Sequence, residues 1–301
     1  MRMLDPTIRW MAMALALVPN YAADCCKNSA AVVFSLSGSA TIRSPGSSAK
    51  VAVSSLDWLS DGATLEVGTG SRVVLILSNG RRFELGQGAK ATLTANAAPK
   101  TTGAVREMPA LPPIPKPVAV AADSAPTSGA VRVRGGEDMS GSLYPRAGMA
   151  ALPDKLTLRY KSVPDATSYR VALENDGSDI LLNVTTDSTE VSVPAGTIEA
   201  GARYRWRVRA MRSGVAIGVG TAEFTTLSAE NALQRTEFAS VLGATDNDPA
   251  TLALLAEVDL RLGLVAEACD EFSVALRRKP EDVTLRRALD SARASLAGQD
   301  R

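Results

Sequence analysis

The chain has 301 residues, enough for two or three domains, and only 4% of them are aromatic, so each core must be small and mainly aliphatic. Its 33 basic and 32 acidic side chains leave a net charge of +1, which gives no overall attraction to nucleic acid or an anionic membrane. There are no histidines. Ser-His-Asp and Cys-His nucleophile systems and imidazole metal ligands are therefore excluded. We expect no enzyme, cofactor or metal, although carboxylates, lysines and thiols could still catalyse.

Residues 1–23 have the pattern of a secretory signal peptide. Arg2 and Arg9 lie before an apolar run over 10–18, and Arg9 is directly next to it. Pro19 and Asn20 end the run, and the small residues Ala22 and Ala23 follow. The run is too short for a permanent membrane helix, which needs about 20 apolar residues. No later segment is apolar enough to span a membrane. We therefore expect a periplasmic or secreted protein of the bacterial envelope that does not span the membrane after signal cleavage.

The three cysteines are Cys25, Cys26 and Cys269. Cys25 and Cys26 are adjacent, so they cannot bridge to each other without distorting the backbone. A disulfide from either of them to Cys269 is possible and would leave one thiol spare. The simpler interpretation is that no structural disulfide forms and that Cys269 is a small apolar residue in a helix.

Residues 30–97 predict a small all-β unit. The apolar run over 73–77 meets Asn79 and Gly80, a strong hairpin signal, and the chain returns through Phe83 and Leu85. The segments 56–65 (LDWLSDGATL), 67–73 (VGTGSRV) and 75–81 (LILSNGR) resemble the FecR-type domain. This resemblance implies a β-sandwich-like or β-helical module of the cell envelope. Relatives that regulate sigma factors carry a membrane helix before the module, whereas a signal peptide is expected here, so we do not expect that regulatory role.

Residues 98–153 are dominated by Pro, Ala, Gly, Ser and Thr. Their centre, 108–117 (MPALPPIPKP), favours an extended left-handed helix that cannot pack a core. We expect a linker between domains. The alternative is a ligand segment for an aromatic-lined groove.

Residues 154–227 predict a second β domain. The strand 202–210 (ARYRWRVRA) alternates, with Tyr204, Trp206 and Val208 on one face and arginines on the other. This strand and the segment 163–169 (VPDATSY) resemble the fibronectin type III domain. The resemblance implies an Ig-like β-sandwich in which Tyr204 forms a hydrogen bond back to the preceding turn. It also implies a role in binding or spacing rather than in catalysis.

Residues 228–301 change to a helical period. Asp248 caps a helix that begins at Pro249. The positions that follow resemble one tetratricopeptide repeat: Leu252, Leu255, Ala256, Gly263, Ala268, Phe272, Ala275 and Pro280. One departure is Asp259, where the family prefers a large aromatic residue. Flanking helices are expected over 229–242 and 282–296. A single repeat forms no long peptide groove, so we expect this helical region to dock a partner protein by another surface.

The candidate partner-binding site is a basic stripe on one face of the second β domain: Arg203, Arg205, Arg207 and Arg209, with Arg170 as a candidate neighbour. Such a stripe could bind cell-wall phosphate polymers or an acidic protein. The simpler interpretation is a solvated strand face. The carboxylates around Gly177 and at Asp248 indicate a turn and a helix cap rather than a calcium loop.

Together these patterns predict a multidomain, mainly β protein. It has a FecR-like β module, an Ig-like fibronectin type III β-sandwich and a small C-terminal α-helical repeat region. We expect a non-enzymatic periplasmic binding or scaffold protein that engages an envelope component and a partner, either an envelope protein or a cell-wall polymer, but no nucleic acid. The alternative is an accessory of envelope signal transduction that presents a stimulus to a membrane sensor or cyclase. A wall hydrolase is a third hypothesis, which the absence of histidine disfavours.

Overall fold

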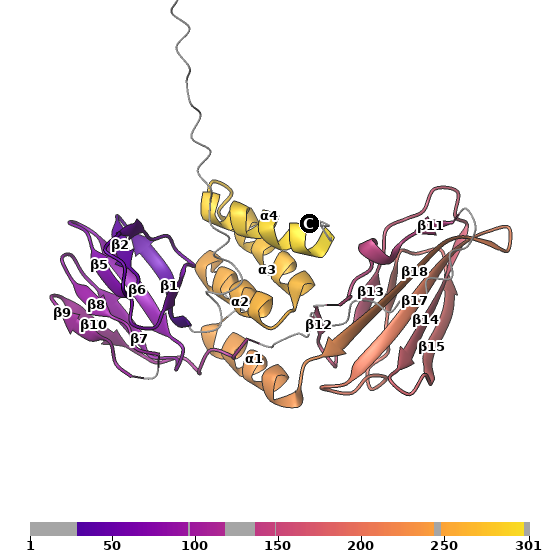
Figure 1. Cartoon of the computed structure of the whole chain (residues 1–301), viewed down its shortest axis with the longest axis horizontal. Helices are drawn as coiled ribbons and strands as arrows, with labels where there is room; N and C mark the ends of the chain where they lie inside the picture. Colours follow the sequence, from indigo (N-terminus) through magenta and orange to yellow (C-terminus); the bar gives the residue numbers. More distant parts are fainter. Residues whose placement is uncertain (1–28, 96, 118–135, 148, 244–247, 298–301) are drawn as a thin grey trace, which may run out of the picture.

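The computed structural model describes residues 29–95, 97–117, 136–147, 149–243 and 248–297. Helices α1 (Ala229–Leu242), α2 (Pro249–Arg261), α3 (Val265–Arg278) and α4 (Val283–Ala297) lie between two β units (Figure 1). The expected signal peptide over 1–23, and with it Cys25 and Cys26, lies outside the described residues. No helix within the described ranges is long and apolar enough to cross a membrane.

The first β unit consists of two antiparallel sheets, with strand orders β10-β7-β6-β1-β4 and β3-β2-β5-β8-β9. Its strands are β1 (Ser29–Ser37), β2 (Ala40–Arg43), β3 (Val51–Ala52), β4 (Trp58–Ser60), β5 (Thr64–Val67), β6 (Arg72–Leu77), β7 (Arg82–Leu85), β8 (Lys90–Thr92), β9 (Lys100–Thr102) and β10 (Val105–Met108). The hairpin expected at Asn79 and Gly80 is present between β6 and β7, and Gly80 takes a φ of 85°.

The sheet that contains β1 and β6 is buried on both faces. Leu75 and Leu77 pack into the core between the two sheets, whereas Val32 and Ile76 pack against α1 and α2. A strand that is covered on both sides has no polar face. This double burial explains why β6 is a continuous apolar run instead of an alternating one.

The first β unit extends into the range that was predicted as linker. Strand β9 pairs with β8, and β10 pairs with β7, so this unit reaches Met108 rather than ending at 97. The three residues of β9 are exposed, and β10 has no buried residue. These edge strands have a composition that does not differ from that of a linker, which is why the sequence pattern does not reveal them.

The proline-rich run after β10 is packed rather than free. The Leu111 N–H donates to the Gly80 carbonyl at 2.9 Å, and the Ile114 N–H donates to the Ser78 carbonyl at 3.0 Å. The Leu111 and Ile114 side chains are 9% and 6% exposed and belong to the apolar cluster that also contains α1 and α2 residues. The expectation that this run cannot contribute to a core is wrong for these two residues, because every third side chain of an extended helix returns to the same face.

The second β unit also begins inside the predicted linker. Strands β11 (Glu137–Asp138) and β12 (Ala150–Ala151) pair in parallel with β18 (Val215–Thr226), and a short 3-10 helix covers Ser140–Ser142. The main sheet has the order β11-β18-β17-β14-β15, with β14 (Ser168–Asn175), β15 (Ile180–Thr186) and β17 (Arg203–Arg212). Strands β13 (Thr157–Arg159) and β16 (Glu190–Ser192) form a second, two-stranded sheet.

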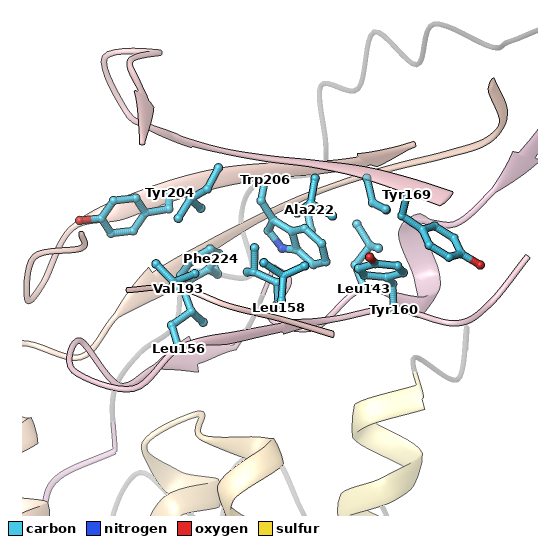
Figure 2. Close-up of a cluster of buried hydrophobic side chains, with 14 of the residues drawn as sticks. Leu143, Leu156, Leu158, Tyr160, Tyr169, Val193, Tyr204, Trp206, Ala222 and Phe224 are labelled. Carbon is cyan, nitrogen blue, oxygen red and sulfur yellow. The ribbon is translucent and has the colours of Figure 1, made fainter. Parts of the chain in front are cut away.

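The core of the second β unit lies between these two sheets. Figure 2 shows Trp206 in the middle of it, with Leu158 and Phe224 beside it and the hydroxyls of Tyr204 and Tyr169 pointing outward at opposite ends. Trp206 is fully buried, and its Nε1–H donates to the Pro145 carbonyl at 2.8 Å. The hydrogen bond expected of Tyr204 is present, since the Glu199 N–H donates to its hydroxyl at 2.6 Å.

The helices begin and end close to where the sequence places them. The Asp248 carboxylate accepts the Thr251 N–H at 3.0 Å, and Pro249 is the first residue of α2. Helix α1 covers the expected 229–242, and α4 begins one residue later than expected. The apolar stripe packs α2 and α3 together through Leu252, Ala256, Ala268 and Phe272, and α4 adds to that core.

Candidate interaction surface

The helices contact the first β unit through the loop before β4 and through β4 itself. Leu56 has the left-handed φ of 72°, which is costly for a bulky residue, and its side chain packs in the core of α2 and α3. The centre of the Trp58 ring lies 3.8 Å from the Arg261 guanidinium carbon, and the Trp58 Nε1–H donates to Glu257 at 3.3 Å. Arg261 also donates to the Ser29 hydroxyl at 2.7 Å. Stacking, hydrogen bonding and apolar burial therefore all act at this junction.

The second β unit contacts the opposite side of the helices. The Tyr144 hydroxyl donates to Glu267 of α3 at 3.1 Å, and the Ala150 N–H donates to the Gly263 carbonyl at 2.9 Å. Arg146 donates to the Ser295 carbonyl of α4 at 2.7 Å. The helical region, which the sequence suggested as a docking element for a partner protein, thus packs on both β units of its own chain.

A buried ion cluster joins α1, α2 and α3 between these contacts. Asp259 is fully buried and accepts from Arg235 of α1 at 3.0 and 2.7 Å, while Arg235 also donates to Glu271 of α3 at 2.9 Å. Burial raises the pKa of Glu267 and of Glu271, because removal of water disfavours the charged carboxylate. The position where the tetratricopeptide pattern has an aromatic residue is therefore filled by an ion pair with the preceding helix.

The predicted arginine stripe lies on the main sheet of the second β unit, on the side opposite Trp206. Arg203, Arg205 and Arg209 are exposed, and Arg207 is half-buried. Two of the four are paired within the sheet: Arg205 donates to Glu223 of β18 at 2.9 and 2.6 Å, and Arg207 donates to Glu174 of β14 at 2.8 Å. The stripe is consequently less basic than its sequence alone suggests.

The expected neighbour Arg170 is on the same face, directly opposite Arg209. Sequence reasoning missed the two pairing glutamates, Glu174 and Glu223. Glu223 lies opposite Arg205 because the β17–β18 register shifts at a bulge between Ala210 and Met211, and the alternation within each strand does not reveal that shift.

The remaining candidates have structural roles. Cys269 is buried in α3 within the core that joins the helices, and burial raises the pKa of its thiol to about 11. The turn after β14 is held by the Asp179 N–H, which donates to the Asn175 side chain at 2.8 Å. Within the described ranges, no group of three or more histidine, cysteine or acidic side chains is placed to hold a metal ion.

No protein-family model matches the chain. No curated protein matches it either. Among solved structures, the crystal structure of FN3tt is similar at 24% identity and a TM-score of 0.23, covering 26% of this chain and 83% of that one. The crystal structure of chicken CNTN1 FN1-FN3 domains is similar at 12% identity and a TM-score of 0.25, covering 67% of this chain and 62% of that one.

Both of these structures are of fibronectin type III domains, the kind of domain that residues 154–227 resemble in sequence. By its own elements the described part of the chain is mainly β, with two β units and the helices α1 to α4 in its C-terminal part.

Proposed function

We propose that this chain is a non-enzymatic binding and scaffold protein of the bacterial envelope. In this proposal the helices hold the two β units together as one body, and the arginine face of the second β unit binds an anionic envelope component. One observation carries it: the helices contact both β units, while Arg203, Arg205 and Arg209 remain exposed on the outer face of the main sheet.

The sequence resemblances supply the location. The first β unit would be a FecR-like envelope module, α2 and α3 a tetratricopeptide-like pair, and residues 1–23 the export signal. The zero count of histidines supports the non-enzymatic part of the proposal. An exported chain would meet envelope polymers and proteins rather than nucleic acid, so the proposed ligand is one of these.

The location is tested by expressing the full chain with a C-terminal tag in a diderm bacterium and separating periplasmic, membrane and cytoplasmic fractions. We expect the processed chain in the periplasmic fraction. An unprocessed chain in the cytoplasm would contradict the proposal.

The binding role is tested by sedimenting the purified mature chain with isolated cell envelopes. We expect retention at low salt and release at high salt, because exposed charges are screened as ionic strength rises. No retention at low salt would count against binding. Recovery of a membrane sensor or cyclase from solubilised envelopes would favour the signalling alternative.

A further inference from the structure

Two arginines face each other across neighbouring strands on the outer face of the second β unit. Arg170 of β14 is directly opposite Arg209 of β17, and both side chains are exposed. Directly opposite residues have Cβ atoms about 5 Å apart, and like charges at such positions destabilise the sheet. The sequence therefore retains two positive charges at positions where their repulsion lowers the stability of the sheet.

Two other arginines of this face differ, because carboxylates of the sheet neutralise them. Arg205 pairs with Glu223, and Arg207 pairs with Glu174. Neither Arg170 nor Arg209 has a carboxylate within 4.0 Å among the residues that the structure describes. The acidic residue at the end of their row, Asp138 on β11, is separated from Arg209 by Val219 and accepts the Ser140 N–H at 2.9 Å.

The neighbours of the pair include several uncharged polar side chains. Thr185 of β15 lies opposite Arg170 on its other side. In the next row of the same face, Asn183 is opposite Ala172 of β14, and Thr221 of β18 is opposite Arg207. A row of two guanidinium groups with a hydroxyl at its end thus presents several hydrogen-bond donors to an open surface.

We propose that Arg170 and Arg209 bind a phosphate monoester group, and this deepens the proposed function by assigning a chemical class to the ligand of the arginine face. A phosphate monoester has close to two negative charges and three acceptor oxygens, so it can balance both guanidinium groups and accept hydrogen bonds from each. A carboxylate has one charge and leaves one arginine uncompensated. Because the site is an open sheet face, the phosphate group belongs to a larger exposed molecule that leaves most of its surface outside the site.

The site is tested by titrating the full mature chain with inorganic phosphate and with glycerol 3-phosphate, using acetate at equal ionic strength as the comparison. Nuclear magnetic resonance of the arginine Nε–H groups reports the two side chains separately. We expect both phosphate probes to shift the signals of Arg170 and Arg209, and acetate to bind more weakly. Equal responses to acetate and phosphate, or shifts spread evenly over all exposed arginines, would overturn the proposal.

Variants separate a local site from a general charge effect. Arg170→Ala and Arg209→Ala should each weaken phosphate binding about tenfold, as expected for one charge-assisted hydrogen-bonding group. The matched control, Arg277→Ala with Arg278→Ala, removes two exposed charges at the end of α3 and should leave binding unchanged. If the control weakens binding as much as the double change of Arg170 and Arg209 does, the site is not local and the proposal fails.

Stability provides a second readout. Arg170→Glu places a carboxylate opposite Arg209, so it should abolish phosphate binding and raise the Tm by about 2 °C, since a like-charge pair becomes an opposite-charge pair. A lower Tm together with unchanged phosphate binding would overturn the inference.

The inference and the proposed function can fail separately. If envelopes still retain the Arg170→Ala, Arg209→Ala double variant as well as they retain the wild type, the binding role stands and the phosphate site fails. If the purified chain binds phosphate at this pair but envelopes do not retain it, the site stands and the proposed function fails.

Discussion

Gly80 lies where the hairpin of the first β unit meets the proline-rich run. Its φ is 85°, and a Cβ added to it would be 2.1 Å from the Leu111 carbonyl oxygen. Replacement by alanine therefore adds a backbone clash to the ordinary cost of a left-handed conformation. We expect Gly80→Ala to lower the free energy of unfolding by about 3 kcal/mol in denaturant titrations and to expose 109–117 to protease.

Gly88 provides the matched control for this prediction. It has a φ of 72°, but an added Cβ would have no heavy atom within 4 Å. Gly88→Ala should cost only the left-handed conformation, about 1 kcal/mol. Equal losses for the two variants would mean that the packing of the proline-rich run on Gly80 contributes nothing to stability.

The Glu257 carboxyl, at the contact between α2 and Trp58 of β4, makes the stability of the protein depend on pH. Its pKa is raised to about 7, mainly by burial, against the lowering effects of the Trp58 hydrogen bond and the Arg261 charge, and Asp57 raises it further. The folded protein then keeps a proton that the unfolded chain, with an ordinary pKa of 4.5, has released. The contribution of this group to stability is therefore lost as pH rises from about 4.5 to 7, by at most ~3 kcal/mol.

Glu257→Gln should remove this part of the pH dependence, because the amide does not titrate and its oxygen can still accept from Trp58. Unfolding free energies measured between pH 4.5 and 8 should decline less steeply in the variant than in the wild type. Glu281→Gln, in the exposed loop between α3 and α4, should leave the slope unchanged. If Glu257→Gln and wild type have parallel profiles, burial does not hold the proton on this carboxyl.

At the scale of elements, Arg235 of α1 determines whether α2 can keep a buried carboxylate. Asp259 has no exposed surface and is paired with Arg235 through two hydrogen bonds. Arg235→Met would leave that charge uncompensated, which typically costs about 3–5 kcal/mol. We expect a loss of this size in thermal or denaturant unfolding. Adding Asp259→Leu should recover most of the loss, because it removes the unpaired charge. No recovery in the double variant would assign the loss to packing of the arginine stem instead.

Elements with a strong period could be predicted from the sequence, and those defined only by their partners could not. β17 alternates cleanly and α2 has both a cap and an apolar stripe, so each is found where the pattern places it. β9 and β10 are exposed edge strands without an apolar face, and they exist because β8 and β7 offer free edges.

The candidate site was predictable to a similar extent. The alternation of β17 was enough to place its arginines on one face, but their neutralisation by Glu174 and Glu223 depends on the register of three strands. The opposition of Arg170 and Arg209 comes from the same register, between segments about 40 residues apart in the sequence. A period within one strand contains no information about register between strands.

At the scale of the whole molecule, the order of the elements along the sequence differs from their order in space. The helices come last in the sequence but lie between the two β units (Figure 1). Apolar residues from both β units and from the proline-rich run meet in one cluster with α1 and α2, including Val32, Leu111, Leu227 and Phe238. The single body on which the proposed scaffold role depends thus requires contacts made by α1 and α2, which follow both β units along the chain.

The left-handed backbone of Leu56 is explained by the contact of its side chain with the helices. Its strained left-handed backbone directs a side chain that is 8% exposed into the helical core, and such strain persists only where surrounding contacts compensate for it. Leu56→Asp should therefore separate the first β unit from the helices. We expect a larger radius of gyration in small-angle X-ray scattering and faster proteolysis within 109–117, with β-sheet circular dichroism retained. Val51→Asp, at a 61% exposed position of β3, is the matched control and should leave scattering and proteolysis unchanged. If Leu56→Asp scatters like the wild type, the helices do not hold the first β unit through this contact, and the remaining contacts, such as Val32 with α1 and α2 and Trp58 with Arg261, are sufficient.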